Sequence, residues 1–215
     1  MKLRHTLLLS AIAAAAALPA RASTLGMRYA GVSAEYYAMQ SDDAPDWDSA
    51  YGFALGVRSP LLDHVDGYAA LRVDYFSYDD NGEDATSDGD MRRHYGSLEG
   101  RFDIHLGKEY IFNPFVGVGA VYIHANERTG SLNTERDGKG ALLLGGGLEI
   151  NFCESVSLLG QCFFQTKAGE IADEQIHAYG ALNAWLESGV LASVFCRYAA
   201  DAEDLTAGIA FHGAF

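Results

Sequence analysis

Carboxylates are the residues of this sequence that are best suited to chemistry. The segment DDNGEDATSDGD, residues 79–90, holds six acidic side chains within twelve positions. Carboxylate oxygens are ligands that Ca²⁺ prefers, although this segment lacks the spacing and the closing glutamate of an EF-hand. Its composition favours a solvated acidic loop. The candidate ligands for a divalent cation in this loop are Asp79, Asp80, Glu83, Asp84, Asp88 and Asp90.

A second group of charged residues alternates with apolar neighbours. In GYAALRVDYFSY, residues 67–78, Arg72 and Asp74 lie opposite Leu71 and Val73. Both signs of charge occur in this group, which suits a buried network of paired charges rather than a solvated surface. The members of the predicted network are Glu35, Arg58, Arg72, Asp74, Glu99, Arg101, Asp103, Glu149 and Arg197.

The elements that must position these side chains are β-strands. After residue 22 the apolar residues recur at every second position, which is the period of a strand with two different faces. No apolar run in this part reaches the length of about 20 residues that a membrane-spanning helix needs. Ten strands are predicted, at residues 27–39, 49–59, 67–78, 93–105, 113–125, 139–151, 156–166, 176–186, 190–199 and 205–215.

The connections between the predicted strands alternate in length. Those after odd-numbered strands are polar and often long, as at residues 79–90 and 126–138, whereas those after even-numbered strands are mostly short, as at 152–155. Strands of about ten residues in an even number, with this alternation of loops, are typical of a transmembrane β-barrel. We therefore predict an all-β fold, a closed antiparallel up-and-down transmembrane barrel of ten strands.

The chemistry of the two faces indicates which of them meets lipid. A membrane barrel has an apolar outside and a polar inside, whereas a soluble exported carrier has the reverse. The soluble carrier would also be expected to carry lysines on its outer face, but the sequence has Lys108, Lys139 and Lys167 at expected turns or loops. We predict that the apolar face meets lipid, and a soluble ligand-binding barrel remains an alternative.

The first 22 residues have the pattern of a secretory signal peptide. Two basic residues, Lys2 and Arg4, precede a short apolar run, and Ala20-Arg21-Ala22 provides small residues at a cleavage site. We predict a cleaved signal at residues 1–22 and a transmembrane barrel at residues 23–215. Removal of the signal lowers the formal net charge from −14 to −17, because it contains three basic residues and no acidic residue. A protein this acidic is not expected to bind nucleic acid.

Three cysteines, Cys153, Cys162 and Cys196, cannot all pair within the chain. The predicted strands place Cys162 and Cys196 about two strand spacings apart, roughly 10 Å, which is too far for a disulfide. We predict that the cysteines are free and that Cys153 is the accessible one.

The chain resembles the small outer-membrane β-barrel proteins of Gram-negative bacteria, the OmpA-transmembrane and opacity-protein group. The resemblance lies in the signal peptide, in NPFVGVGAVY at residues 113–122, and in a last strand that ends on an aromatic residue. It implies that Phe215, Phe211 and Ile209 form the insertion signal read by the barrel-assembly machinery, with Gly213 departing from the usual aromatic. The smallest members of the group have eight strands, so eight is the alternative count.

The resemblance also implies a location in the bacterial outer membrane, with membrane lipids and lipopolysaccharide as partners. We expect a polar, largely plugged lumen, acidic external loops, no cofactor, and a structural, interaction or narrow-pore role. The external loops could share divalent cations with lipopolysaccharide phosphates. An outer-membrane lipid- or peptide-modifying enzyme is the alternative function. Its candidate bases, His105, His124, His177 and His212, are more simply explained as interior or interfacial residues, so no catalytic residue is predicted.

Overall fold

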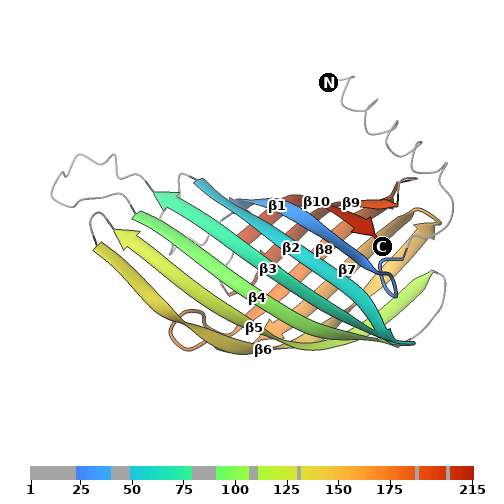
Figure 1. Cartoon of the computed structure of the whole chain (residues 1–215), viewed down its shortest axis with the longest axis horizontal. Coiled ribbons are helices and arrows are strands. Elements are labelled where there is room, and N and C mark those ends of the chain that lie inside the picture. The colour runs from blue at the N-terminus through green and yellow to red at the C-terminus, as the bar shows by residue number, and fades with distance from the viewer. Residues whose placement is uncertain are drawn as a thin grey trace, which may run out of the picture.

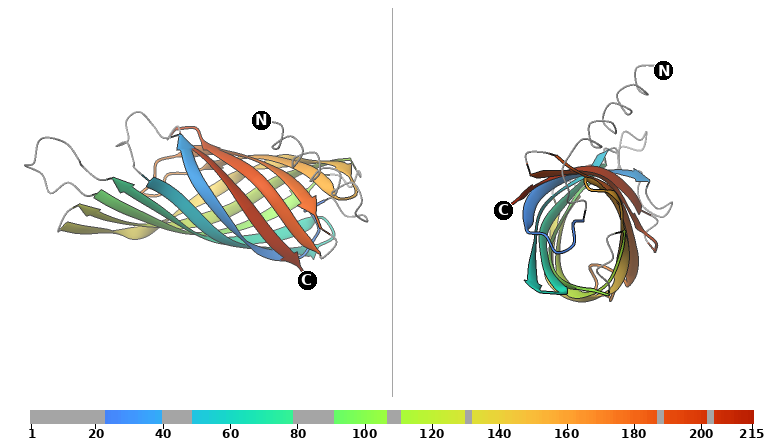
Figure 2. Two further views of the ribbon diagram at one scale, coloured as in Figure 1. Left: turned by 90° about the horizontal axis from the view of Figure 1, so that it is seen from above. Right: turned by 90° about the vertical axis from the view of Figure 1, so that its right-hand side faces the viewer.

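The chain folds into ten antiparallel β-strands that close into one barrel (Figures 1 and 2). The computed structural model describes residues 23–39, 49–78, 91–106, 111–129, 132–186, 189–201 and 204–215. The strands are β1 (Tyr29–Met39), β2 (Ser49–Leu62), β3 (Val65–Tyr78), β4 (Met91–His105), β5 (Phe112–Thr129), β6 (Leu132–Cys153), β7 (Val156–Gln165), β8 (Gln175–Trp185), β9 (Val190–Ala199) and β10 (Asp204–Ala214). The predicted all-β fold and the count of ten strands are confirmed.

Closure of the barrel depends on the pairing of the first and last strands. Tyr29 of β1 lies opposite Ala214 of β10, and the antiparallel register continues to Tyr37 opposite Thr206. Every other strand pairs with its neighbours in sequence, so the connectivity is up-and-down throughout. A closed barrel leaves no unpaired strand edge, which is the condition for crossing a lipid bilayer with strands.

The two ends of the barrel differ in their connections. At one end, which we call the short-turn end, lie the start of β1, the end of β10 and turns such as Asp63–His64 and Glu154–Ser155. The other end, called here the long-loop end, carries the connections that follow odd-numbered strands. In the described part of the chain, no helix is long and apolar enough to cross a membrane.

The largest difference from the predicted strands lies in the hairpin of β5 and β6. Residues 126–138 were expected to form a loop, but most of them continue the two strands, and Thr129 pairs with Leu132. The hairpin therefore reaches beyond its neighbours at the long-loop end (Figure 1). Lys139 was placed at a turn and lies within β6 instead. Backbone pairing with the adjacent strand stabilises this polar stretch, although it lacks the apolar alternation that marks a strand in sequence.

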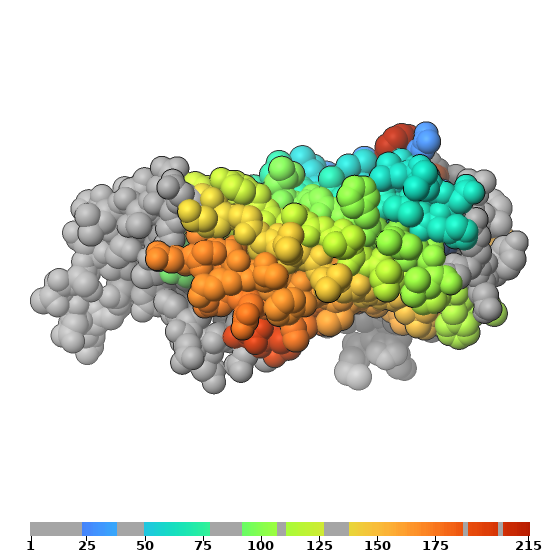
Figure 3. Space-filling model, turned by 90° about the horizontal axis from the view of Figure 1, so that it is seen from below, coloured from blue at the N-terminus to red at the C-terminus, as the bar shows by residue number. Residues whose placement is uncertain are grey.

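An unbroken row of apolar side chains crosses the outer face. Phe211, Val32, Leu55, Leu71, Leu98 and Tyr122 are successive register partners on β10, β1, β2, β3, β4 and β5. Each of them is about half exposed, from 49% for Phe211 to 56% for Leu98. Figure 3 shows part of this outer wall, where side chains of neighbouring strands pack closely. An apolar belt of this extent is too large for a water-exposed surface and suits a lipid-facing one.

The inner face is less uniformly polar than predicted. Buried aromatic and aliphatic side chains point inward from β5, β6, β7 and β9, among them Phe115, Leu143, Phe163 and Phe195. Phe115, Leu143 and Phe163 form a cluster that also includes Leu25, before β1, and Ala168, after β7. Segments from both ends of the barrel thus contribute to packing inside it.

Candidate functional site

The candidate site is the inner face of the barrel, where the charged residues gather in two clusters. The short-turn cluster is built around Arg58 of β2. Its guanidinium group donates to Asp66 of β3 at 3.1 Å and to Asp103 of β4 at 2.5 Å. All three side chains are at most 3% exposed. Pairing with two carboxylates compensates the loss of hydration of the buried arginine.

Arg101 extends this cluster across the interior of the barrel. It binds both oxygens of Asp103, at 2.7 and 3.2 Å, and donates to Glu99 at 3.1 Å. The guanidinium carbon lies 4.3 Å from the ring centre of Phe163 on β7 and 4.8 Å from that of Tyr68 on β3. Because β4 and β7 are not neighbours in the sheet, Arg101 spans interior space between them. Stacking on aromatic faces is favourable for a desolvated guanidinium.

Glycines on the inner face make room for these large groups. A Cβ atom at Gly117 would lie 2.6 Å from the ring of Phe163 and 2.7 Å from Asp103. At Gly147 it would lie 2.8 Å from the ring of Phe115. A side chain at either position would displace these rings or the carboxylate of Asp103, so both positions require glycine.

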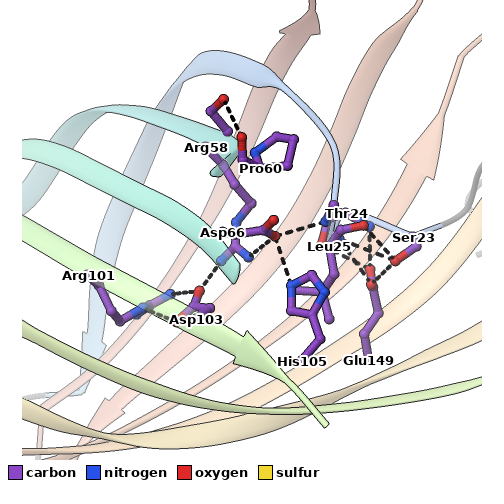
Figure 4. Close-up of polar contacts among 12 residues, drawn as sticks. Ser23, Thr24, Leu25, Arg58, Pro60, Asp66, Arg101, Asp103, His105 and Glu149 are labelled. Carbon is purple, nitrogen blue, oxygen red and sulfur yellow. Dashed lines mark hydrogen bonds and ion pairs between the residues drawn. The ribbon is translucent and has the colours of Figure 1, made fainter. Parts of the chain in front are cut away.

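Glu149 of β6 has a different set of partners at the short-turn end (Figure 4). It is fully buried and accepts hydrogen bonds from the backbone and side chain of Thr24, from the hydroxyl of Ser23 and from the backbone of Leu25. The hydroxyl of Ser157 on β7 donates to the same carboxylate at 2.9 Å. Glu149 therefore holds the segment that precedes β1.

A line of neutral polar groups continues from Glu149 around the wall. Asn183 of β8 donates to the hydroxyl of Ser157 at 3.3 Å, and Ser193 of β9 donates to the amide oxygen of Asn183 at 2.7 Å. On the other side, the backbone N–H of Gly26 donates to Asp66 at 2.8 Å. The segment before β1 thus links the Glu149 group to the Arg58 group.

The long-loop cluster centres on Arg72 of β3. Its guanidinium group binds Asp74 at 2.6 Å and Glu35 of β1 at 3.0 Å, and it donates to the hydroxyl of Tyr37 at 3.0 Å. Arg197 of β9 lies 3.6 Å from Glu35 and is about one third exposed. This cluster balances two arginines with two carboxylates.

All nine residues of the predicted charge network point into the barrel. The structure brings Arg58, Glu99, Arg101 and Asp103 into one cluster and Glu35, Arg72, Asp74 and Arg197 into the other, with Glu149 bound to the segment before β1. Alternation alone was sufficient to assign their face, whereas the partners of each residue depend on which strands become neighbours.

Sequence reasoning missed several members of the site. Asp66 and His105 lie 3.1 Å apart, but neither was included in the predicted charge network. Asp66 follows the same alternation as Asp74, so extending the predicted strand 67–78 by one residue would have included it. Tyr37 was not among the predicted site residues, but its hydroxyl lies inside the barrel and accepts a hydrogen bond from Arg72. No sequence pattern marked Ser23 and Thr24 as site residues, because their hydrogen bonds are to Glu149 on β6, which is distant in sequence.

The remaining candidate residues are placed as follows. The six acidic residues proposed as cation ligands lie at 79–90, outside the described residues. Within the described ranges, no group of three His, Cys, Asp or Glu side chains could hold a metal ion. The candidate base His212 packs edge-on against the ring of Tyr29. All three cysteines are free and exposed. Accessibility is therefore not limited to Cys153 in the isolated chain, because Cys162 and Cys196 belong to the outer face.

Of the three residues of the predicted insertion signal, Ile209 and Phe211 lie on the outside of β10 and Phe215 directly follows its last residue. Ile209 and Phe211 are about half exposed, and Phe215 is 74% exposed. The backbone N–H of Phe215 donates to the carbonyl of Arg28 at 3.3 Å, which holds the chain end beside the start of β1. An aromatic ring at this position suits the headgroup region of a membrane.

Deletion of Phe215 is expected to reduce, several-fold, the amount of folded barrel recovered from membranes, while leaving export intact. The reason is that its ring is exposed and accessible to the barrel-assembly machinery, instead of packing inside the barrel. Heat-dependent gel mobility of membrane fractions measures the folded barrel. Phe112→Ala, which removes another half-exposed aromatic at the short-turn end, is the control. Equal recovery for both variants would contradict the signal.

Comparisons with known proteins agree with this architecture. Residues 6–162, well over half of the chain, match the family described as outer membrane protein beta-barrel domain. The translocator domain of the autotransporter NalP from Neisseria meningitidis is similar in fold, with a TM-score of 0.54 at 10% identity, covering 100% of this chain and 97% of that one.

Two further solved structures are similar to a lower degree. Ail, the attachment invasion locus protein of Yersinia pestis, has 14% identity and a TM-score of 0.38, covering 87% of this chain and 98% of its own. The N-terminal barrel domain of Pseudomonas aeruginosa OprF has 15% identity and a TM-score of 0.37, covering 88% and 98%. A comparison with curated proteins found no match. From its fold and its match over residues 6–162, the chain belongs to the outer-membrane β-barrel protein family.

Proposed function

We propose that this protein is an integral outer-membrane barrel whose lumen is closed to general diffusion, and that it serves a structural or interaction role. The observation that carries the proposal is the position of Arg101. Its guanidinium group lies between ring systems on two non-adjacent strands, 4.8 Å from Tyr68 and 4.3 Å from Phe163. Side chains that meet in this way across the interior leave little cross-section for a solute.

Barrel size supports the same proposal. Wide aqueous channels are found in barrels of about 16 to 18 strands, whereas those of about eight are filled by their own side chains. A ten-stranded barrel lies near the second case, and its inner face carries both ion-pair clusters and buried rings. The inner face carries arginines and carboxylates side by side. It therefore has no continuous lining of one charge sign that would attract ions of the opposite sign through the barrel.

The proposed surroundings follow from the outer face and the family. The apolar belt would contact membrane lipids, and the acidic loops at the long-loop end would meet lipopolysaccharide, with divalent cations bridging acidic groups and phosphates. The barrel-assembly machinery would bind the last strand during insertion. A signal peptide at residues 1–22 would direct export.

Planar-bilayer recording on the refolded protein tests the closed lumen. We expect no steady single-channel current from the natural sequence. The double variant Arg101→Ala/Phe163→Ala should conduct, because it removes two side chains that meet inside the barrel. The matched control is Phe102→Ala/Phe164→Ala, which changes the adjacent outward-facing residues and should stay silent. A steady current from the natural sequence would contradict the proposal and favour a narrow pore.

A further inference from the structure

The segment Ser23–Gly26, which we call the amino-terminal segment, crosses the interior of the barrel before β1 begins. Its contacts are with Glu149 of β6 and Asp66 of β3. In the closed strand order, β6 is five positions from β1 in either direction, so the segment reaches the opposite wall. Leu25 anchors it there, packed into the apolar cluster that includes Phe115 and Phe163.

Glu149 differs from the other buried carboxylates of the short-turn end. Asp66 and Asp103 each bind Arg58, and Asp103 and Glu99 bind Arg101. By contrast, the five donors to Glu149 described above are neutral hydroxyl and backbone groups. Among the described residues, Arg58, Arg101 and His105 pair with the other three carboxylates of this end, and none of them pairs with Glu149. A fully buried carboxylate is costly unless a positive charge accompanies it.

We infer that Glu149 is the binding site for the chain's own α-ammonium group, which is created when the signal is cleaved before Ser23. Hydrolysis of the Ala22–Ser23 peptide bond consumes one water, leaves a carboxylate on Ala22 and an amine on Ser23, and the amine is protonated at neutral pH. The hydroxyl of Ser23 already lies 2.6 Å from a Glu149 oxygen. Because the α-nitrogen is separated from this hydroxyl by only two carbon atoms, an ammonium there is within reach of the carboxylate.

The consequence is an ion pair that can form only after the signal has been removed. The ion pair fixes the amino-terminal segment to β6, and the bond from Gly26 to Asp66 fixes it to β3. The uncleaved chain has a neutral amide at the same position and lacks the attraction. Processing is thereby coupled to the stability of the short-turn end, whether or not any solute passes through the barrel.

A coupling experiment on the refolded mature chain tests this inference. The chain beginning at Ser23 is prepared with a free and with an enzymatically acetylated amino terminus, each with Glu149 and with Glu149→Gln. Urea unfolding in vesicles is followed by tryptophan fluorescence, to which Trp185 at the short-turn end contributes. With Glu149 present, acetylation should lower the folded-to-unfolded ratio about tenfold or more, as expected for a hydrogen bond between charged groups. With Glu149→Gln, it should have an effect within about twofold.

Additive effects of the two changes would overturn the inference, and so would a mature protein from membranes whose first residue is not Ser23. If Glu149→Gln does not refold, the labelling rate of the amino terminus by an amine-reactive reagent decides the matter. We expect labelling of the natural chain to be about tenfold slower when folded than when unfolded, as expected for an amine held in an ion pair of this strength. Equal rates would overturn the ion pair. If the natural sequence conducts no current and the effects of the two changes are additive, the ion pair is overturned but the proposal of a closed lumen is not.

Discussion

Replacing Arg58 with methionine is expected to lower the free energy of unfolding by about 3 kcal/mol or more. Arg58 is 3% exposed and contacts Asp66 and Asp103, which are themselves buried. Methionine would fill part of the space but leave both carboxylates short of positive charge. Removing one partner of a buried charged group costs far more than the pair contributes, because the remaining charge has no solvent.

The matched control for this change is Arg197→Met. Arg197 also faces the interior and approaches a carboxylate, but at 3.6 Å and with 31% of its side chain exposed. Water can replace such a partner, so its loss should cost less than about 1 kcal/mol. Denaturant unfolding of both variants in lipid vesicles provides the measurement. Similar losses for the two would show that the Arg58 cluster is not the buried centre of charge described above.

Leu71→Arg is expected to destabilise the barrel in a bilayer by about 2–4 kcal/mol. Leu71 lies in the middle of β3, is 49% exposed, and pairs in register with the exposed Leu55 and Leu98. A charge placed in this apolar belt would have to enter hydrocarbon or distort the membrane. On a water-soluble barrel the same exposed substitution would be nearly neutral, so the variant separates the two alternatives.

Leu62→Arg is the control, because Leu62 is 69% exposed at the short-turn end. A charge near the interface should change the free energy of unfolding by no more than about 1 kcal/mol. The measurement is unfolding of each refolded variant in vesicles. If Leu71→Arg and Leu62→Arg had the same small effect, the apolar belt would not be the lipid-facing surface.

The fold was predictable because its determinants are local. In a strand, neighbouring side chains point to opposite faces, so the alternation of residues such as Leu71 and Arg72 reports both the strand and the face of each side chain. Loop length supplied the up-and-down order. The main error concerns the hairpin of β5 and β6, where residues 126–129 pair with residues 132–135. These residues are mostly polar and lack the apolar alternation from which the other strands were predicted.

The candidate site was predictable only as a set of inward-facing charges. Its partners depend on strand closure and stagger, which place Arg58 between Asp66 and Asp103 and bring Arg101 to Phe163. Glu149 was assigned to the correct face, but four of the five hydrogen bonds that it accepts come from Ser23, Thr24 and Leu25, more than 120 residues away.

The sequence by itself determined a membrane barrel with its apolar face outward and its charges inward, because both properties repeat at every second residue, and its ten alternating segments predicted ten strands. Only the tertiary structure decided which charges pair, that buried rings share the interior with them, and that the amino-terminal segment crosses to the opposite wall. Those features arise from contacts across the interior of the closed barrel. Local sequence patterns do not specify which strands face one another across that interior or how far apart they lie.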